Sequence, residues 1–454
     1  MDKREARSEV PGQTRWAKWV SQHGLISGLV VGVSVTLIAV LAVPWLIPSR
    51  DVEKGELVIL SGRDDSVGRQ RQVLIEQWNR SHPANPARIE EVSRDPRNEM
   101  VKRAQAADSD IDIYNLDLTW TAEFAENNYI RRLSGVSTDG FLDKPLSTCF
   151  YEKRLDGVPF SGESLYALPF NTDAGLLYYR ADLVSRPEGW DSVISETRRV
   201  LGQRADPALK AGYTGQLDTY EGLTVNVLEA IRDVGGTIGV DENGNLQLDL
   251  DKAQVAVDRL RPRQGDDYPI VLPESLGYDE QRSTQAMREG KVLFLRNWPL
   301  AYRTLVAPSG EETAAGGRRF EVTQLPGGSS ILGGQNLAVS RHSAEPRAAT
   351  RLIEFLTSEP SQRLLFEEGG FAATRQSVYD NPSIQARYAY TQELRKAVNS
   401  AEPRPQGPCY GRFSEIFRST VAEALGTGNP LPDDFVDRLG TALNCQPTDD
   451  RSAY

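Results

Sequence analysis

The chain has 454 residues, of which 39% are hydrophobic and 25% are charged. This composition is that of a globular protein and excludes a disordered chain, and the length suggests two or three domains. The net charge of −11 argues against nucleic acid as the main partner, because binding to phosphates needs a basic surface.

The N-terminal region contains an uncharged apolar stretch. Residues 19–49 include no Asp, Glu, Lys or Arg, and Leu25–Ile47 is long enough, at about 1.5 Å per residue, to cross the roughly 30 Å apolar core of a membrane. Lys and Arg residues precede it, so the positive-inside rule places residues 1–24 in the cytoplasm and the chain after Arg50 outside it. A cleaved signal peptide is the alternative, although its apolar region is usually only about 7–15 residues long. We therefore expect an uncleaved single-pass anchor in the cell membrane at residues 25–47, with an extracytoplasmic domain behind it.

Apolar patterns after the polar linker 50–56 predict strands that alternate with helices. The expected strands are 57–60, 87–92, 111–115, 166–169, 174–179, 292–295 and 336–339. The expected helices are 67–80, 97–107, 119–129, 219–234, 345–357, 361–368, 412–425 and 432–443. Asp173 is placed in the turn between the fourth and fifth strands, and Asn243-Gly244 is typical of a hairpin turn. This alternation predicts an α/β protein.

The motifs of common enzymes and metal sites are missing from the sequence. It has three His, and it contains no G-x-S-x-G nucleophile turn, no G-x-x-x-x-G-K-[ST] phosphate loop and no H-E-x-x-H metal helix. We therefore expect no cofactor, no metal and no enzymatic activity. Paired carboxylates can still hydrolyse a glycosidic bond, and Asp117 with Asp173 or Glu221 keeps that alternative open.

Three cysteines occur, at positions 149, 409 and 445. Outside the cytoplasm a pair of them can oxidise. Cys409 and Cys445 bracket one C-terminal segment and are the favoured pair, with three unpaired thiols as the alternative. Their spacing does not fit a zinc site.

Several segments follow one another in the order that is typical of a known family. They are residues 117–124 (DLTWTAEF), 166–180 (YALPFNTDAGLLYYR), 220–223 (YEGL), 296–299 (RNWP) and 332–340 (LGGQNLAVS), followed by Gly369-Gly370 and Arg375. This set resembles the extracellular solute-binding proteins, family 1, of ABC importers, and most of all their maltose and trehalose binders. The resemblance covers nearly all of residues 55–425.

The resemblance implies an α/β, periplasmic-binding-protein-like fold of type II. Such a fold has two lobes, each a mixed sheet flanked by helices, which close like a hinge on a ligand in the cleft between them. Lobe 1 would comprise residues 55–170 and 297–338. Lobe 2 would comprise residues 171–296 and 339–454.

The resemblance also implies a site for a sugar-like ligand. Sugar hydroxyls favour ionised partners, and the apolar faces of the rings favour aromatic side chains. Asp117 and Asp173 would accept hydrogen bonds from hydroxyls, and Trp298 would stack on a ring. The further ligand-binding candidates are Asp65, Glu221, Gly334, Gln335 and Arg404.

Each main candidate also has a purely structural interpretation. Asp117 could be a helix N-cap, Asp173 could cap a turn, Glu221 could compensate the charge of its helix start, and Trp298 could pack in the core. Two positions depart from the family pattern. Leu300 stands where relatives often have an aromatic residue, and Gln335 stands where they commonly have Trp. Two stacking platforms are thus missing, and Gln335 is expected to form hydrogen bonds instead.

The expected function is capture of a carbohydrate-like ligand for the permease subunits of an ABC importer. A membrane-tethered ligand sensor or regulatory module with the same fold is one alternative. An extracytoplasmic glycoside-processing enzyme is the other.

Overall fold

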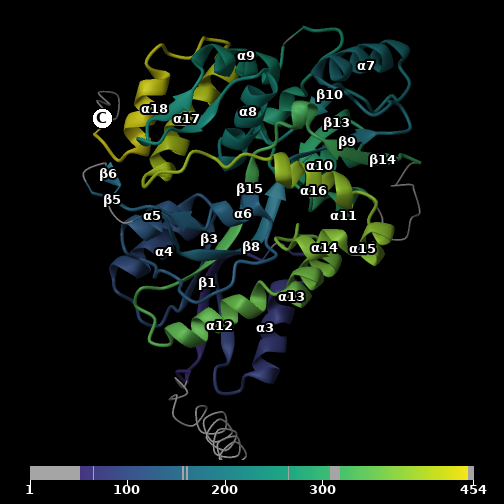
Figure 1. Cartoon of the computed structure of the whole chain (residues 1–454). Coiled ribbons are helices and arrows are strands. Elements are labelled where there is room, and N and C mark those ends of the chain that lie inside the picture. Colours follow the sequence, from purple (N-terminus) through teal and green to yellow (C-terminus); the bar gives the residue numbers. More distant parts are fainter. Residues whose placement is uncertain are drawn as a thin grey trace, which may run out of the picture. The chain divides into compact units, whose positions relative to one another are not determined.

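The computed structural model of the chain describes residues 52–64, 66–155, 158–159, 162–263, 265–306 and 317–447 (Figure 1). The predicted cytoplasmic segment 1–24, the predicted membrane helix 25–47 and the candidate Asp65 lie outside the described residues. Among the helices that are described, none combines the length and the apolar character needed to cross a bilayer.

The first lobe is built on a five-stranded mixed sheet with the order β2-β1-β3-β15-β8. Its strands are β1 (Leu57–Gly62), β2 (Ala87–Val92), β3 (Ile113–Asp117), β8 (Ala167–Ala174) and β15 (Leu332–Val339). β1, β2 and β3 are parallel, and β15 runs antiparallel to both β3 and β8. Leu57–Leu60 is buried along its whole length, as expected for a strand with helices on both faces of its sheet.

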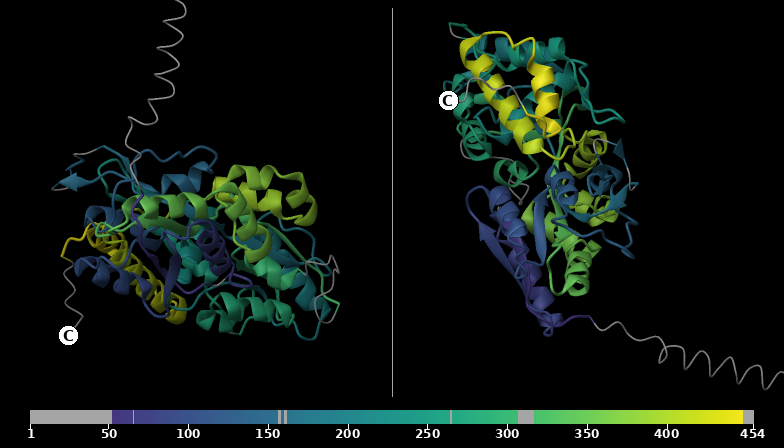
Figure 2. Two further views of the ribbon diagram at one scale, coloured as in Figure 1. Left: turned by 90° about the horizontal axis from the view of Figure 1, so that it is seen from below. Right: turned by 90° about the vertical axis from the view of Figure 1, so that its left-hand side faces the viewer.

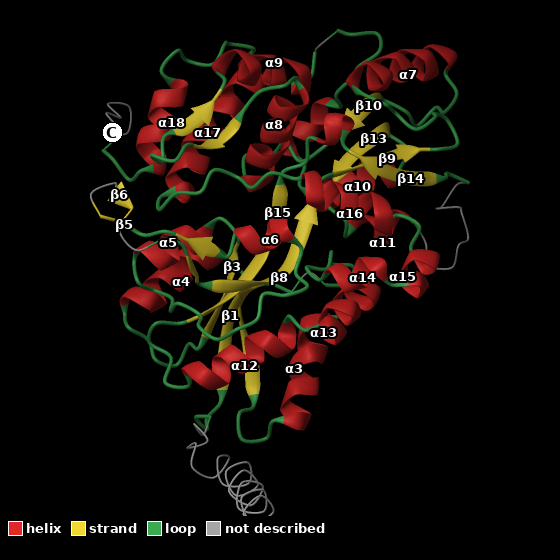
Figure 3. Ribbon diagram, in the orientation of Figure 1, coloured by secondary structure: helices red, strands yellow, loops and turns green. Residues whose placement is uncertain are grey.

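Helices surround this sheet (Figure 3). They are α3 (Gln70–Ser81), α4 (Pro96–Gln105), α5 (Trp120–Glu126), α6 (Asp143–Ser147), α12 (Pro346–Leu356) and α13 (Glu359–Leu364), and η3 (Leu365–Gly369) follows the last of them. In α3 the apolar positions Leu74, Ile75 and Trp78 are buried. Their spacing of one and three residues puts them on one face of the helix, which explains why the helix lies against the sheet.

The second lobe is built on a four-stranded mixed sheet with the order β10-β13-β9-β14. Its strands are β9 (Leu176–Arg180), β10 (Ala211–Thr214), β13 (Val292–Asn297) and β14 (Phe320–Gln324). Its helices are α7 (Trp190–Gln203), α8 (Glu221–Asp233), α9 (Leu250–Leu260), α10 (Glu280–Arg288), α17 (Tyr410–Thr427) and α18 (Phe435–Leu443). The right-hand view of Figure 2 separates the yellow C-terminal helices of this lobe from the purple N-terminal elements of the first.

The remaining elements are short. They are β4 (Phe150–Tyr151), β5 (Arg154–Leu155), β6 (Val158–Pro159), β7 (Ser164–Leu165), β11 (Ile238–Val240), β12 (Leu246–Leu248), η1 (Pro273–Gly277), η2 (Pro326–Gly328), α11 (Ala301–Leu305), α14 (Gln376–Asp380), α15 (Pro382–Arg387) and α16 (Thr391–Ser400). β11 and β12 form the hairpin that Asn243-Gly244 predicts, and Gly244 has a positive φ of 82°.

The chain passes from the first sheet to the second at Gly175, the single residue between β8 and β9. A Cβ atom at this position would lie 2.3 Å from Oε1 of Glu229 and 2.9 Å from Nη2 of Arg296. Only glycine therefore fits at this crossover, because a buried ion pair of the second lobe packs directly against the backbone.

Three predictions about this architecture are wrong in detail. Asp173 lies inside strand β8 and not in a turn. Residues 297–338 were assigned to lobe 1, but β14 pairs with β9 of the second sheet. Residues 339–454 were assigned to lobe 2, but α12 packs on β15, β8 and α3 of the first lobe. The local pattern predicts the helix at 345–357 but no strand at the position of β14, and the lobe to which each element belongs is decided by tertiary packing.

The favoured cysteine pair is confirmed. Cys409 and Cys445 form a disulfide with a Cα–Cα distance of 5.2 Å. It joins the start of α17 to the residues that follow α18, two helices that also share the buried rings of Phe417 and Phe435. Cys149 is a buried free thiol.

Candidate ligand-binding site

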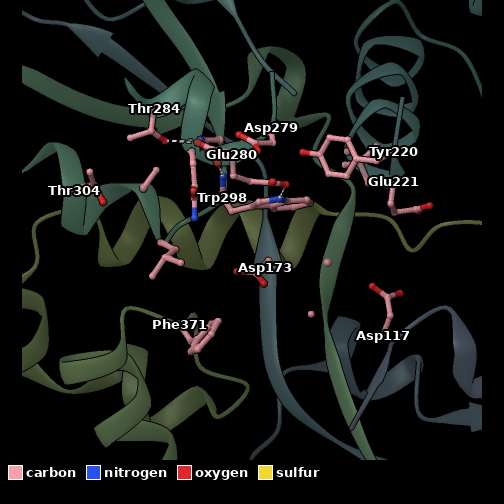
Figure 4. Close-up of a pocket in the computed structure, with 18 of the residues that line it drawn as sticks. Asp117, Asp173, Tyr220, Glu221, Asp279, Glu280, Thr284, Trp298, Thr304 and Phe371 are labelled. Atoms are coloured by element: carbon pink, nitrogen blue, oxygen red, sulfur yellow. Dashed lines mark hydrogen bonds between the residues drawn. The ribbon is translucent and has the colours of Figure 1, made fainter. Parts of the chain in front are cut away.

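A cavity of about 900 Å³ lies between the two sheets (Figure 4). The ends of β3, β8 and β15 form one wall, and the starts of α8 and α10 together with the residues after β13 form the other. Seven predicted site residues line it: Asp117, Asp173, Glu221, Trp298, Gly334, Gln335 and Arg404. These residues come from elements that lie far apart in the chain, and the fold brings them to one cavity. Their role in ligand binding stays a prediction.

Trp298 has one face against the protein and the other toward the cavity. The guanidinium carbon of Arg296 lies 3.8 Å from the ring centroid. Indole Nε1 donates to Oε1 of Glu280 at 3.2 Å, and the Tyr178 hydroxyl donates to the Trp298 carbonyl at 2.9 Å. A Cβ atom on Gly333 would lie 3.2 Å from the indole edge. Trp298 is therefore a fixed, partly exposed platform and not a core residue.

Arg296 is itself held by a buried ion pair. Its Nε and Nη2 atoms each donate to a carboxylate oxygen of Glu229 at 2.7 Å. Both side chains are almost fully buried. A bidentate pair of this kind leaves little freedom to the guanidinium, so it also fixes the orientation of the Trp298 ring in front of it.

Asp173 lies on β8 opposite Gly333 of β15. Figure 4 shows its carboxyl between Trp298 and Phe371. Burial raises the pKa of this carboxyl to about 7, although the charges of Arg296 and Arg71 act in the opposite direction. The side chain is thus poised between the neutral form and the carboxylate near neutral pH.

Arg404 bridges carboxylates of the two lobes. Its Nη2 donates to both oxygens of Asp117, at 2.9 and 3.2 Å, and its Nη1 donates to Oε1 of Glu221 at 2.6 Å. Glu221 also accepts from the hydroxyls of Tyr410 and Ser414 at 2.5 Å each. Burial lowers the pKa of Arg404, but the charges of Asp117 and Glu221 outweigh it, so the pKa is raised. The guanidinium stays charged and holds these two walls together.

Asp117 is not the helix N-cap that its structural interpretation predicts, because the N-cap of α5 is Thr119; it orders the turn before the helix instead. Its Oδ1 accepts from the backbone N–H of Thr119 at 2.9 Å and from the Thr119 hydroxyl at 2.7 Å. This carboxylate therefore orders the turn before α5 while it pairs with Arg404. Both roles fix its position at the cavity wall.

Gln335 and Gly334 follow each other on β15. The Gln335 amide oxygen accepts from Nη2 of Arg71 at 2.6 Å. The Arg71 guanidinium packs on the ring of Phe371, 5.2 Å from its centroid. Gly334 has a φ of 126°, and a Cβ atom there would lie 2.3 Å from the Asn171 carbonyl oxygen. Glycine thus allows β15 to approach β8, and Gln335 forms a hydrogen bond as its residue type predicts.

Some lining residues were not found from the sequence. The main ones are Tyr220, Asp279, Glu280 and Phe371. Tyr220 directly precedes a predicted site residue and Phe371 directly follows the family segment Gly369-Gly370, but Asp279 and Glu280 carry no local signal. Leu300, one of the two departures from the family pattern, also lines the cavity.

The arrangement suits a ligand that is rich in hydroxyl groups. An indole face offers contact area to an apolar ring surface, and carboxylates accept hydrogen bonds around it. The glycosidase alternative needs two carboxyl groups that face one scissile bond, whereas Asp117 and Glu221 both accept hydrogen bonds from Arg404. In the described part of the chain, no group of three or more His, Cys, Asp or Glu side chains could hold a metal ion.

The known proteins that this chain resembles include solute-binding proteins and a transporter-binding protein. The family profile described as "Bacterial extracellular solute-binding protein" matches residues 79–392. A protein of Deinococcus radiodurans named "Probable ABC transporter-binding protein" is 27% identical over 332 residues, which cover 70% of this chain and 76% of the relative. The structure of maltose-bound T. maritima MalE3 is 25% identical with a TM-score of 0.71, covering 86% of this chain and 98% of that one. A solute-binding protein of Thermotoga lettingae bound with α-D-tagatose has a TM-score of 0.70 at 20% identity, covering 86% and 99%.

Proposed function

This chain belongs to the bacterial extracellular solute-binding proteins, and we propose that it captures a carbohydrate-like ligand between its two lobes for delivery to an ABC importer. The observation that carries this proposal is the position of Trp298. Its indole face is open to the cavity, and the Asp173 and Glu280 carboxylates lie beside the ring. A pyranose needs this combination, because its C–H face packs on an aromatic ring while its hydroxyls seek ionised acceptors.

The relatives support the same ligand class and the same partner. MalE3 is described with maltose and the T. lettingae protein with α-D-tagatose, and the D. radiodurans relative is named for an ABC transporter. The partners of this chain would then be a small carbohydrate and the permease subunits of an importer.

Closure of the lobes would couple binding to delivery. The cavity walls belong to different sheets, and the single residue Gly175 is one of the connections between them. A ligand that contacts both walls stabilises the closed form by its differential affinity for the two states. The moving bodies would be the predicted lobes, with β14 in the second and α12 in the first.

The family places the binding domain outside the cytoplasm. The Cys409–Cys445 disulfide fits an oxidising compartment. We further propose that residues 25–47 tether the domain to the cell membrane as a single-pass helix, with residues 1–24 in the cytoplasm. Fractionation of cells that express the full chain tests this: the protein should stay in the membrane fraction in high salt and be released by detergent.

The binding proposal is tested by a thermal-unfolding screen of the chain from Gly55 onward. A ligand that binds only the folded state raises the unfolding midpoint. We expect at least one carbohydrate of a broad panel of monosaccharides and oligosaccharides to raise it, and Trp298→Ala to reduce the shift at the same ligand concentration. A panel in which no carbohydrate moves the midpoint, while the chain unfolds cooperatively, would refute the proposal.

A further inference from the structure

Gln335 presents a hydrogen-bond donor of fixed direction to the cavity. Its amide oxygen accepts from Nη2 of Arg71 at 2.6 Å. Arginine has donors only, so a reversed amide would place its N–H groups against the guanidinium. The Nε2 group has no hydrogen-bond partner in the described part of the chain. Because Gln335 is partly exposed and lines the cavity, this N–H end is the one that a ligand meets.

Arg71, which sets the direction of the amide, is itself held in place. The residue is only 4% exposed, and its Nη1 donates to the Ser61 hydroxyl at 3.3 Å. Its guanidinium packs on the rings of Phe170 and Phe371, with 5.6 and 5.2 Å to the centroids. These contacts leave the guanidinium little freedom, so the donor of Gln335 is oriented before a ligand binds.

An acceptor lies at a matching distance from this donor. Gln335 pairs with Asn171 across β15 and β8, and Asp173 is two residues further along β8. Diagonal neighbours of an antiparallel pair lie about 7–8 Å apart on one face of the sheet. A secondary amide fits this interval, because its carbonyl and its N–H point in opposite directions and each forms a hydrogen bond of about 2.9 Å.

The same part of the cavity contains an apolar corner. Leu300 and Phe371 line it, and Cδ1 of Leu300 lies 3.0 Å from the position of a Cβ atom on Gly370, the residue before Phe371. Figure 4 shows Phe371 on the side of the Asp173 carboxyl that is opposite to Trp298. A methyl group on the carbonyl carbon of the amide would be covered by these apolar side chains.

The guanidinium groups near Gln335 do not favour a carboxylate ligand. Arg71 forms an ion pair with Asp64 at 3.7 Å, and Arg404 is already paired with two carboxylates. Arg63 is exposed, so solvent and salt screen its charge. These three arginines therefore offer no buried, uncompensated positive charge to an acidic sugar.

The carboxyl groups of the cavity favour a neutral donor and acceptor. Asp173, Asp279 and Glu280 line the cavity and have no ion-pair partner in the described part of the chain. A ligand carboxylate at Gln335 would be repelled by Asp173. A protonated amine has no acceptor for Nε2 of Gln335. A neutral amide satisfies both residues, since it accepts from Gln335 and donates to Asp173.

We propose that Gln335 and Asp173 recognise the acetamido group of an N-acetylated amino sugar. The carbonyl oxygen accepts from Nε2 of Gln335, and the N–H donates to Asp173. The methyl group packs on Leu300 and Phe371, while the sugar ring stacks on Trp298. The two departures from the family pattern, Leu300 and Gln335, then serve one group of the ligand. This inference rests on the proposed function, since it names the class of carbohydrate that the same cavity holds.

Calorimetric titration of the full-length chain with matched sugars tests the inference. The probes are glucose, galactose and mannose, their 2-amino and 2-acetamido derivatives, and the β-1,4-linked disaccharides and trisaccharides of the glucose set. Within a set the sugars differ only in the substituent at C2. In at least one set the acetamido sugar should bind at least about tenfold more tightly than the sugars with a hydroxyl or an ammonium group there.

The variant Gln335→Glu keeps the shape of the side chain but replaces the donor by an acceptor that pairs with Arg71. It should lower the preference for the acetamido sugar to about twofold or less and leave the affinity for the hydroxyl sugar within about threefold. Gln203→Glu is the matched control, because Gln203 also accepts from an arginine, Arg199 at 3.3 Å, but at the end of α7. It should leave every affinity unchanged.

Arg71 is a positioning residue in this scheme. Arg71→Lys keeps a donor for the amide oxygen and should retain most of the preference, whereas Arg71→Met frees the amide to rotate and should lower the preference to about threefold or less. The readout is the ratio of the affinities for two matched sugars. A general loss of structure lowers both affinities together and leaves this ratio unchanged.

Two results would overturn the inference while leaving the proposed function intact. One is a chain that binds a carbohydrate but binds no acetamido sugar more tightly than its matched sugars. The other is an acetamido preference that survives in Gln335→Glu. If no carbohydrate of any kind binds, the proposed function fails together with the inference.

Discussion

The guanidinium of Arg296 lies directly behind the indole of Trp298, with 3.8 Å between its carbon and the ring centroid. Glu229 holds Arg296 along one edge of the guanidinium through two hydrogen bonds of 2.7 Å. The aromatic platform of the cavity is thus supported by a buried ion pair of the second lobe. Its orientation does not depend on the ligand, so little ordering is left to occur on binding.

Removal of the platform should weaken binding without unfolding the protein. Trp298→Ala is expected to reduce the affinity for the carbohydrate found in the screen by about tenfold or more, because aromatic contact area to the ring is lost. Isothermal titration measures this. Trp298→Phe should retain part of the affinity, since a smaller aromatic face remains.

The chain offers a matched control for this variant. Trp190 also has a guanidinium over its ring, that of Arg259 at 5.3 Å, but it packs against Tyr213 away from the cavity. Trp190→Ala should leave the ligand affinity unchanged. If the two alanine variants lose equal affinity, the assignment of Trp298 as the stacking residue is wrong.

The buried ion pair behind the platform makes a second prediction, on stability. Glu229→Gln leaves the Arg296 guanidinium buried without its counter-charge. The free energy of unfolding should fall by about 3–5 kcal/mol, as expected when one partner of a buried pair is removed. Urea denaturation measures it.

An exposed pair serves as the comparison. Glu196 forms an ion pair with Arg199 on the surface of α7, and Glu196→Gln should change the free energy of unfolding by less than about 1 kcal/mol. A Glu229→Gln variant as stable as the wild type would show that the buried pair does not stabilise the fold.

The sequence predicted the class of fold well because its strands carry strong local signals. The apolar run at Leu57–Leu60 and the spacing of Leu74, Ile75 and Trp78 need no long-range information. The lobe of α12 was predicted wrongly, because the helix turns back onto β15, the strand directly before it in the chain, and onto the distant elements β8 and α3. Asp173 was placed in a turn because the residues around it are polar. In the structure these residues belong to β8, and they are polar because this end of the strand lies at the cavity.

Only part of the site could be predicted, because only some of its residues lie in segments with a recognisable sequence pattern. The order of family segments identified Asp117, Asp173 and Trp298, and the structure brings them to one cavity. Glu280 was missed because α10 carries no motif of its own, and Phe371 was missed although it directly follows the family segment Gly369-Gly370. Only the crossing of the chain between two sheets brings such residues together.

The disulfide should contribute substantially to stability. Cys409 and Cys445 are separated by 36 residues, and closure of a loop of that length corresponds to about 4 kcal/mol in the chain-entropy description. The double variant Cys409→Ser, Cys445→Ser should therefore unfold at a clearly lower temperature in a thermal scan.

Reducing agent provides the control for this effect. It should lower the midpoint of the wild type toward that of the double variant and leave the double variant unchanged. Because α17 also supplies Tyr410 and Ser414 to Glu221, we expect the ligand affinity of the double variant to fall as well. Equal midpoints with and without the bond would contradict a stabilising role.

Asp173 should make ligand binding depend on pH. Burial raises the pKa of its carboxyl to about 7, so below that pH the side chain is mostly protonated and is a weaker acceptor for a ligand hydroxyl. Affinity is therefore expected to rise between about pH 5.5 and about pH 8.5. Titrations across this range should show the rise in the wild type and a flat profile in Asp173→Asn.

The raised pKa of Asp173 should make the ligand-free protein less stable as the pH rises, which is opposite to the expected change in ligand affinity. The folded state binds the Asp173 proton more tightly than the unfolded chain, where an Asp titrates near about 3.9. Its stabilising contribution is thus complete below about pH 4 and is lost as the pH rises through about 7. Urea denaturation of the wild type and of Asp173→Asn isolates it, because the difference between their unfolding free energies should change over this window. A difference that is constant with pH, together with a pH-dependent affinity in Asp173→Asn, would assign the titration to another group.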